Sequence, residues 1–238
     1  MLELIDIDAW KLDQQKAVSP QLRVVLRSRI IRNNLKPMSR LSEPELAKEY
    51  GVSRQPVREA FITLVDEGLL EIRPQRGTFV KKIDYEAVLN ARFVREAVEA
   101  DIIRQLASRP NAELVANLRQ EIADQYKAAS GSPLQFIELD ERFHRSLAQA
   151  AGVARAWDYL EAIKSQMDRV RFMTFEEFPS ITLVKQHEQV VDLIEQQDVK
   201  AAEEAMRSHL REILKSLPKV HEIYPEYFEN SPGSPRDT

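Results

Sequence analysis

The chain has 238 residues, no cysteine, a formal net charge of −4, and 43% hydrophobic and 30% charged residues. This composition excludes disulfides, thiolate metal sites and cysteine nucleophiles, and it predicts a globular protein of one large or two ordinary domains. Residues 20–82 hold 13 Lys and Arg against 7 Asp and Glu, whereas the remainder of the chain is acidic. This asymmetry indicates that the basic segment alone meets a polyanion.

The first residues, "MLELIDIDAWKLDQQKA", carry acids and no apolar core segment, so they are not typical of a signal peptide. No stretch approaches the roughly 20 apolar residues of a membrane span. We therefore expect an N-terminal arm over 1–18, no membrane partner, and a reducing cytoplasmic location.

Residues 19–83 predict a helix, two short helices and a two-stranded hairpin. A helix begins near Ser19 and ends at "KPMS", and the next is "EPELAKEY", with Ser42 as its cap. The third helix, "RQPVREAFITLVDEG", follows the turn "GVS" and ends at Gly68. The segment "LLEIRPQRGTFVKKI" then predicts two strands around an arginine-bearing turn. This order is typical of a winged helix-turn-helix.

The residues that lead the third helix suit the reading of a DNA major groove. Arginine bonds guanine through two atoms, glutamine reads adenine, and a helix N-terminus binds phosphate. A glycine at the hairpin tip lets the main chain approach the nucleic acid closely. The candidate DNA contacts are Arg40, Ser53, Arg54, Gln55, Pro56, Arg58, Arg76 and Gly77. The competing interpretation is a small structural domain with solvated arginines.

The stretch "LSEPELAKEYGVSRQPVREAFITLVDEGLLEIRPQRGTFV" resembles the N-terminal domain of GntR-family bacterial transcription regulators. It shares the "LA-x-x-x-GVSR-x-PVREA" block and a "G-x-x-V" wing, and Gln55 stands where the family more often has Thr. The resemblance implies the same eight DNA contacts and a short palindromic operator in double-stranded DNA.

From residue 84 to 220 the pattern predicts an all-helical antiparallel bundle, so the chain as a whole is mainly α. Helices are expected near 85–107, 111–129, 133–150, 153–174, 180–196 and 199–216. Pro, Gly and Ser are frequent after the last helix and predict a flexible tail over 221–238.

Three histidines lie on apolar helix stripes of this bundle. Asp140 precedes His144 by four residues and so shares a helix face with it. His187 and His209 are equally distant from the turn at Asp198, so they lie at the same height in a helical hairpin. Burying three unpaired imidazoles is costly, and a divalent ion would satisfy all of them. The set suits Zn²⁺, Ni²⁺, Mn²⁺ or Fe²⁺, with Zn²⁺ favoured, against the alternative of satisfied core residues.

The helical half resembles the FCD effector domain of the FadR subfamily, where an Asp-x-x-x-His motif on one helix joins single histidines on two later helices. The resemblance implies a metal at Asp140, His144, His187 and His209, a small organic-acid effector beside it, and a homodimer. Arg95 falls where such domains carry an inward arginine; of Arg169 and Arg171, one is expected to face the cavity, and Arg171 is preferred.

Three functions follow from these features. The first is a transcription regulator, a repressor in the usual family sense, that is controlled by a carboxylate such as a sugar acid and associates with the bacterial nucleoid at its operator. The second is a helical metalloenzyme with a three-His, one-Asp site, but no general base is well placed, because Glu141 and Glu188 adjoin ligands and point to other faces. The third is an architectural DNA-binding protein with structural histidines. We favour the first and expect no enzymatic activity.

Overall fold

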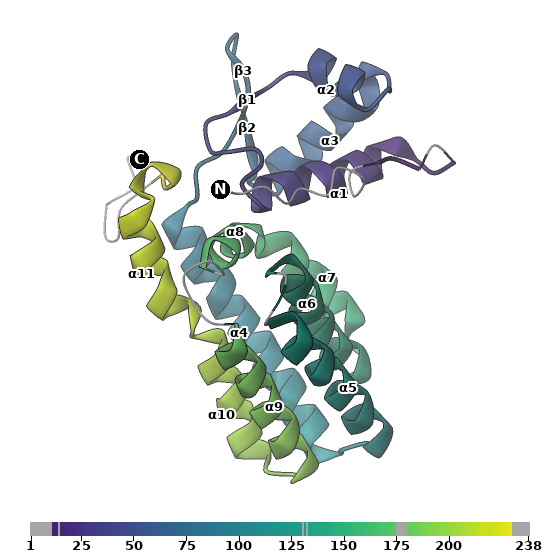
Figure 1. The fold of residues 1–238 in the computed structure, drawn as a ribbon, viewed down its shortest axis with the longest axis vertical. Helices are drawn as coiled ribbons and strands as arrows, with labels where there is room; N and C mark the ends of the chain where they lie inside the picture. Colours follow the sequence, from purple (N-terminus) through teal and green to yellow (C-terminus); the bar gives the residue numbers. More distant parts are fainter. Residues whose placement is uncertain (1–10, 14, 130, 132, 175–179, 230–238) are drawn as a thin grey trace. The chain divides into compact units, whose positions relative to one another are not determined.

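The computed structural model describes residues 11–13, 15–129, 131, 133–174 and 180–229 (Figure 1). The chain divides into two compact units. Unit 1 comprises residues 1–83 with 226–229, and unit 2 comprises residues 84–225 with 230–238. Most of the expected N-terminal arm and the last nine residues lie outside the described residues.

Unit 1 contains three helices and a small antiparallel sheet. Its core is formed by apolar residues of every element, including Leu26, Leu64 and Val80, which are fully buried. The elements are α1 (Val18–Ile31), β1 (Arg40–Leu41), α2 (Glu43–Glu49), α3 (Arg54–Asp66), β2 (Leu70–Arg73) and β3 (Gly77–Val80). The winged helix-turn-helix order is therefore confirmed.

Local chemistry explains the ends of α2 and α3. The Ser42 hydroxyl accepts a hydrogen bond from the amide of Glu45 at 3.4 Å, as the capping box predicts. Gly51 and Gly68 follow the two helices with φ of +65° and +69°, a conformation that suits glycine. Ser53 is the N-cap residue of α3, although its side chain makes no capping hydrogen bond.

The expected two-stranded hairpin is a three-stranded sheet in the order β1-β3-β2. The missed strand β1 is only two residues long, too short for an alternating pattern, and it pairs Arg40 with Phe79. The β2–β3 pair matches Leu70 with Val80 and closes at Arg73 and Gly77.

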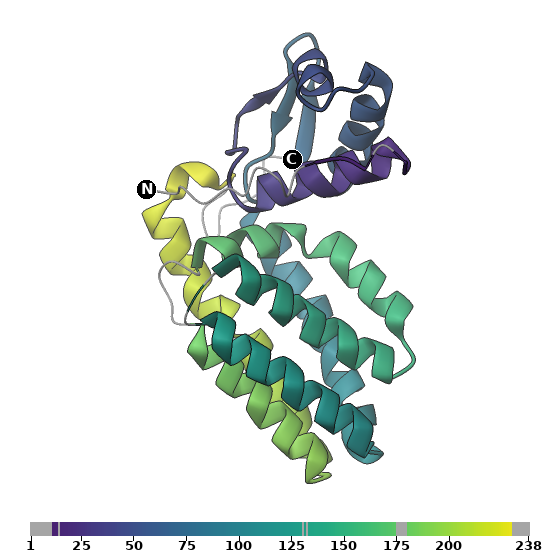
Figure 2. The same cartoon turned by 45° about the vertical axis from the view of Figure 1, so that its right-hand side comes forward.

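Unit 2 is a helical bundle, and two views show which of its helices lie side by side (Figures 1 and 2). The long helix α4 packs against α10, the α9–α10 hairpin packs against α5, and α5 packs against α6. Their bounds are α4 (Tyr85–Ser108), α5 (Ala112–Ala129), α6 (Pro133–Ala150), α7 (Ala154–Ile163), α8 (Ser165–Thr174), α9 (Ile181–Glu195), α10 (Val199–Leu210) and α11 (Ile213–Ile223). The helical class is confirmed, and the apolar residues of α4, α5, α6, α7, α9 and α10 meet in one core.

Two of the expected helices are each interrupted. The helix expected over 153–174 is α7 and α8, separated at Lys164, whose buried ammonium group bonds Glu141 and Asp168. The helix expected over 199–216 ends at Leu210, and α11 begins after a short turn. Neither break carries a glycine or proline at the point of interruption, which is why the sequence did not reveal it.

The chain after residue 220 is more structured than expected. Helix α11 continues past Pro218 to Ile223, with Leu217 and Val220 fully buried and the helix packed against α8. A 3₁₀ turn (Pro225–Tyr227) and a parallel bridge between Phe228 and Ile83 follow. His221, expected beyond the last helix and exposed, lies within α11 with its ring against Tyr85.

Candidate functional site

The exposed face of α3 carries the residues that were expected to read DNA. Ser53, Arg54, Gln55 and Arg58 are exposed, and Pro56 is half-buried in the first turn. The intervening Val57, Ala60, Phe61 and Leu64 are buried and attach the helix to the core of unit 1. The first turns of α3 therefore present polar side chains to solvent from a rigid support.

An acidic residue of α2, missed in the sequence, organises these arginines. Glu43 accepts hydrogen bonds from Arg58 Nε and Nη2, both at 3.1 Å, and from Arg54 Nη2 at 3.4 Å. Hydrogen bonds from Arg58 hold the pKa of the Glu43 carboxyl below its usual value. Spacings of 11 and 15 residues carry no local pattern, so only the packing of α2 on α3 reveals the contact.

The wing and β1 bring the remaining expected DNA contacts together. Arg40 and Arg76 are exposed, and the backbone of Gly77 lies against the Arg40 guanidinium. Gly77 has a φ of +112°, and a Cβ there would lie 3.0 Å from Arg40 Nε. A side chain at this position would therefore displace Arg40 as well as strain the turn.

In unit 2, four residues from three helices meet at one buried point. Asp140 and His144 come from α6, His187 from α9 and His209 from α10, and one ligand atom of each lies within 4.8 Å of all the others. The Nε2 atom of His209 is 3.1 Å from Nε2 of His187 and 3.3 Å from Nε2 of His144. The geometry predicted from the helical hairpin is thus present.

The Nδ1 atom of each imidazole, which faces away from the other two rings, is held by a side-chain oxygen. The Nδ1 atom contacts Glu99 Oε2 in His144 (2.5 Å), Gln125 Oε1 in His187 (2.7 Å) and Gln186 Oε1 in His209 (2.9 Å). Because carboxylate and amide oxygens are acceptors, each Nδ1 carries the proton and each Nε2 presents a lone pair. These three acceptors were missed in the sequence.

Burial and neighbouring charges set the protonation of the cluster. Burial lowers the pKa of His187 to about 3 and that of His209 well below its usual value. Burial alone would raise the pKa of Asp140, but Arg171 and the imidazoles outweigh it and hold the pKa well below 3.8. At Glu99, burial likewise acts to raise the pKa of the carboxyl, but Arg95 and His144 outweigh it and lower that pKa to about 2. Both carboxylates are therefore ionised at neutral pH, and His187 and His209 are neutral.

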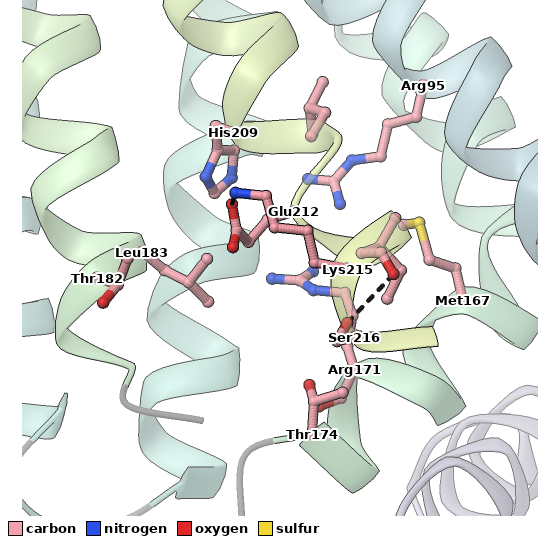
Figure 3. Close-up of a pocket in the computed structure, with 12 residues that line it drawn as sticks. Arg95, Met167, Arg171, Thr174, Thr182, Leu183, His209, Glu212, Lys215 and Ser216 are labelled. Carbon is pink, nitrogen blue, oxygen red and sulfur yellow. Dashed lines mark hydrogen bonds and ion pairs between the residues drawn. The ribbon is translucent and has the colours of Figure 1, made fainter. Parts of the chain in front are cut away.

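A cavity of about 140 Å³ opens beside the cluster (Figure 3). His209 lines it, together with the expected effector residues Arg95 and Arg171, and with Lys215, whose ammonium group pairs at 2.9 Å with Glu212, a carboxylate that also lines the cavity. Thr174, Thr182 and Ser216 contribute hydroxyl groups, and the apolar wall comprises Met167, Leu183, Leu210 and Ile213. The cavity thus combines positive charge and hydroxyl groups with the edge of the histidine cluster.

The arginines of α8 have different surroundings. Arg171 donates to Asp140 Oδ2 at 2.5 Å and lines the cavity. Arg169 is fully buried beside Gln166 and is not among the residues that line the cavity. Glu141 and Glu188, considered as general bases, are bound instead by Lys164 and Tyr126.

Comparisons with known proteins identify both units. Residues 20–80 match the model of bacterial regulatory proteins of the gntR family, and residues 91–212 match the FCD domain. The chain is 38% identical over 220 residues to the HTH-type transcriptional repressor RspR of Escherichia coli K12, covering 92% of this chain and 96% of that protein. The chain belongs to the GntR family of bacterial transcription regulators.

A further relative and a solved structure are similar to this GntR regulator. A probable D-xylose utilization operon transcriptional repressor of Paenarthrobacter nicotinovorans is 29% identical over 197 residues, covering 81% of this chain and 85% of that protein. The solved structure of E. coli McbR/YncC has the same fold, with a TM-score of 0.72 at 15% identity over 88% of this chain and 99% of that one.

The regulator is therefore a DNA-binding transcription factor with an FCD domain, and the metalloenzyme alternative is not supported by the family or its relatives. Among the described residues, none of the helices has the length and apolar character to cross a membrane.

Proposed function

We propose that this regulator is a metal-dependent repressor whose FCD domain binds a small organic acid and thereby changes the affinity of the winged helix for its operator. The arrangement of the three imidazoles carries the proposal. Their Nδ1 atoms are all held by oxygen acceptors, and the Nε2 atom of His209 lies 3.1 Å from that of His187 and 3.3 Å from that of His144. Nε2 lone pairs that face one another repel, and a cation between them removes the repulsion.

The residues fit a divalent metal. Asp140 supplies an ionised oxygen, Oδ1, that is buried and accepts no hydrogen bond from the residues described. Three imidazole nitrogens and one carboxylate oxygen form a donor set that suits Zn²⁺, and Ni²⁺, Mn²⁺ and Fe²⁺ accept the same donors. A bound metal would supply positive charge at the edge of the cavity, where an anion is attracted.

The cavity favours a hydroxylated carboxylate such as a sugar acid. Guanidinium groups at Arg95 and Arg171 match carboxylate geometry, and the threonine and serine hydroxyls match the hydroxyl groups of a polyol chain. The relatives named as repressors support the same sign of regulation here. A homodimer would place two winged helices on the two halves of a short palindrome.

The effector acts if it distinguishes two arrangements of the dimer. One arrangement fits the operator and the other does not. The change in operator affinity is then set by how much more tightly the effector binds one arrangement than the other.

We propose that the operator is contacted by eight residues of the DNA-binding unit: Arg40, Ser53, Arg54, Gln55, Pro56, Arg58, Arg76 and Gly77.

The test combines metal analysis with DNA binding. Purified protein is assayed for bound metal, and its affinity for DNA upstream of its own gene is measured by fluorescence anisotropy with a panel of sugar acids, with and without chelator. We expect about one metal per chain and an acid that weakens DNA binding only in metal-loaded protein.

His187→Ala and His209→Ala provide the decisive variants. Each should lose the metal and the response to the acid while still binding DNA. Protein that carries no stoichiometric metal, together with variants that respond as the wild type does, would instead support an architectural DNA-binding protein with structural histidines.

A further inference from the structure

We infer that Glu99 is a positioning residue that ties the anion-binding Arg95 to the metal ligand His144, so that anion binding in the cavity and metal binding at the cluster strengthen each other. The inference rests on the proposed metal site and names a connection within it. It is carried by a chain of three buried side chains on α4 and α6.

The three acceptors behind the imidazoles are not equivalent. Gln125 and Gln186 are neutral amides, whereas Glu99 is an ionised carboxylate whose Oε2 lies 2.5 Å from His144 Nδ1. A carboxylate behind a ligating imidazole fixes its tautomer and raises its basicity more than a neutral oxygen does. His144 is therefore the imidazole whose donor strength depends most on the group behind it.

Arg95 holds the other oxygen of Glu99 and also faces the cavity. Its Nε donates to Glu99 Oε1, and both side chains are almost completely buried. The Nη2 atom of Arg95 is buried and has no hydrogen-bond partner among the described residues, although Arg95 lines the cavity. One guanidinium thus binds Glu99 on one side and retains a donor for a ligand.

The sign of the coupling follows from the charges. The positive charge of Arg95 weakens the pull of Glu99 on the His144 proton. An anion that binds the free edge of Arg95 offsets part of that charge, so Glu99 withdraws the proton more strongly and His144 Nε2 becomes a better metal donor. By reciprocity, the metal raises the affinity for the anion by the same factor.

The geometry also predicts what a neutral isostere would do. In Glu99→Gln, Arg95 has only donors to offer and therefore selects the amide oxygen of the new side chain. The amide NH₂ then faces His144 Nδ1, which must become an acceptor, and the proton moves to Nε2. That tautomer presents a proton instead of a lone pair at Nε2, so it must be reversed before His144 can bind the metal, and metal affinity falls.

The matched control is Glu96→Gln. Glu96 lies on the same helix, is also buried, and pairs with Arg92 and Arg211 rather than with a histidine. It reproduces the loss of one buried carboxylate charge on α4 without touching the cluster, and so reports the purely structural cost.

The first measurement is the His144 tautomer in metal-free, full-length protein, by ¹⁵N NMR of the imidazole nitrogens. We expect the proton on Nδ1 in the wild type and Glu96→Gln, and on Nε2 in Glu99→Gln. The double variant Arg95→Met/Glu99→Gln removes the competing donor and should return the proton to Nδ1, while the buried charges remain balanced.

The second measurement is Zn²⁺ affinity by competition with a chelating indicator, with and without malonate as the anion probe. Glu99→Gln should bind Zn²⁺ about 10–100-fold more weakly than the wild type, and Glu96→Gln within about twofold of it. Malonate should strengthen Zn²⁺ binding by the wild type and not by Glu99→Gln.

The outcomes separate this inference from the proposed function. Unchanged tautomer and Zn²⁺ affinity in Glu99→Gln would overturn the role of Glu99 even if the metal binds. A tautomer that changes as expected in a protein that binds none of Zn²⁺, Ni²⁺, Mn²⁺ or Fe²⁺ would support the positioning role and overturn the metal-dependent function.

Discussion

The two units use arginine in opposite ways. In the DNA-binding unit, the side chains of Arg54 and Arg58 are 63% and 55% exposed and share one carboxylate, Glu43. In the helical unit, the side chains of Arg95 and Arg171 are 4% and 14% exposed, and each pairs with its own carboxylate, Glu99 or Asp140. The exposed arginines can exchange their carboxylate for another partner, whereas the buried arginines keep theirs.

The difference follows from the solvent. An exposed ion pair contributes about 0–1 kcal/mol, because water and salt compete for both partners. DNA phosphates or bases can therefore replace Glu43 at little cost. A buried charge that loses its partner has no water to replace it, so Arg95 and Arg171 can accept a ligand only while they keep their carboxylates.

The largest effect is expected from breaking a buried pair. Arg171→Ala leaves the ionised Asp140 without its cation and should lower the free energy of unfolding of metal-free protein by about 3–5 kcal/mol. Urea denaturation measures this loss, and added Zn²⁺ should recover part of it by supplying the missing charge.

Arg119→Ala is the exposed counterpart in the same unit. Arg119 pairs with Asp192 and Glu195 but is 39% exposed, so its replacement should change stability by less than about 1 kcal/mol. Equal losses in the two variants would remove the distinction between fixed and exchangeable pairs.

A smaller and selective effect is expected on the DNA-reading face. Arg58→Ala should weaken operator binding by about 1–3 kcal/mol more than binding to random DNA, because both duplexes lose the attraction of one positive charge but only the operator loses the proposed base contact. Fluorescence anisotropy at fixed salt on both duplexes measures the ratio. Arg104→Ala, an exposed change in the helical unit, is the control. An equal loss on both DNAs would make Arg58 a phosphate contact.

The smallest effect is expected from Glu43→Gln. The fold should lose less than about 1 kcal/mol, because the pairs with Arg54 and Arg58 are exposed. Binding to random DNA should strengthen, since one negative charge leaves the surface that is proposed to contact DNA. The operator-to-random ratio should fall a few-fold, because Arg54 and Arg58 are no longer aligned by Glu43. A ratio that does not change would show that Glu43 has no part in specificity.

Short-range spacing of residues in the sequence predicted many of the helix ends and the meeting of the histidines. The capping box at Ser42, the turn glycines and the arginine-led helix are short-range patterns, and the equal distances of His187 and His209 from Asp198 placed their rings together. Glu43, Glu99 and Gln125 were missed because their partners lie 11–15, 45 and 62 residues away. Such contacts depend on how helices pack, which no periodicity records.

The helix breaks were missed for a related reason. Lys164 interrupts α7 and α8 while its ammonium group is buried against Glu141 and Asp168, so tertiary ion pairs accompany a break that local propensity does not show. The last helix was expected to end near residue 216, but α11 continues through Pro218 to Ile223, with Leu217 and Val220 buried.

The bridge between Ile83 and Phe228 changes how the chain should be divided. The Ile83 amide donates to Tyr227 O at 2.8 Å, and the Glu229 amide donates to Ile83 O at 2.9 Å. Residues 84–225 of the helical unit thus lie in the chain between two segments of the DNA-binding unit, 1–83 and 226–229. A fragment that stops at residue 83 therefore lacks the bridge partner of its own last residue.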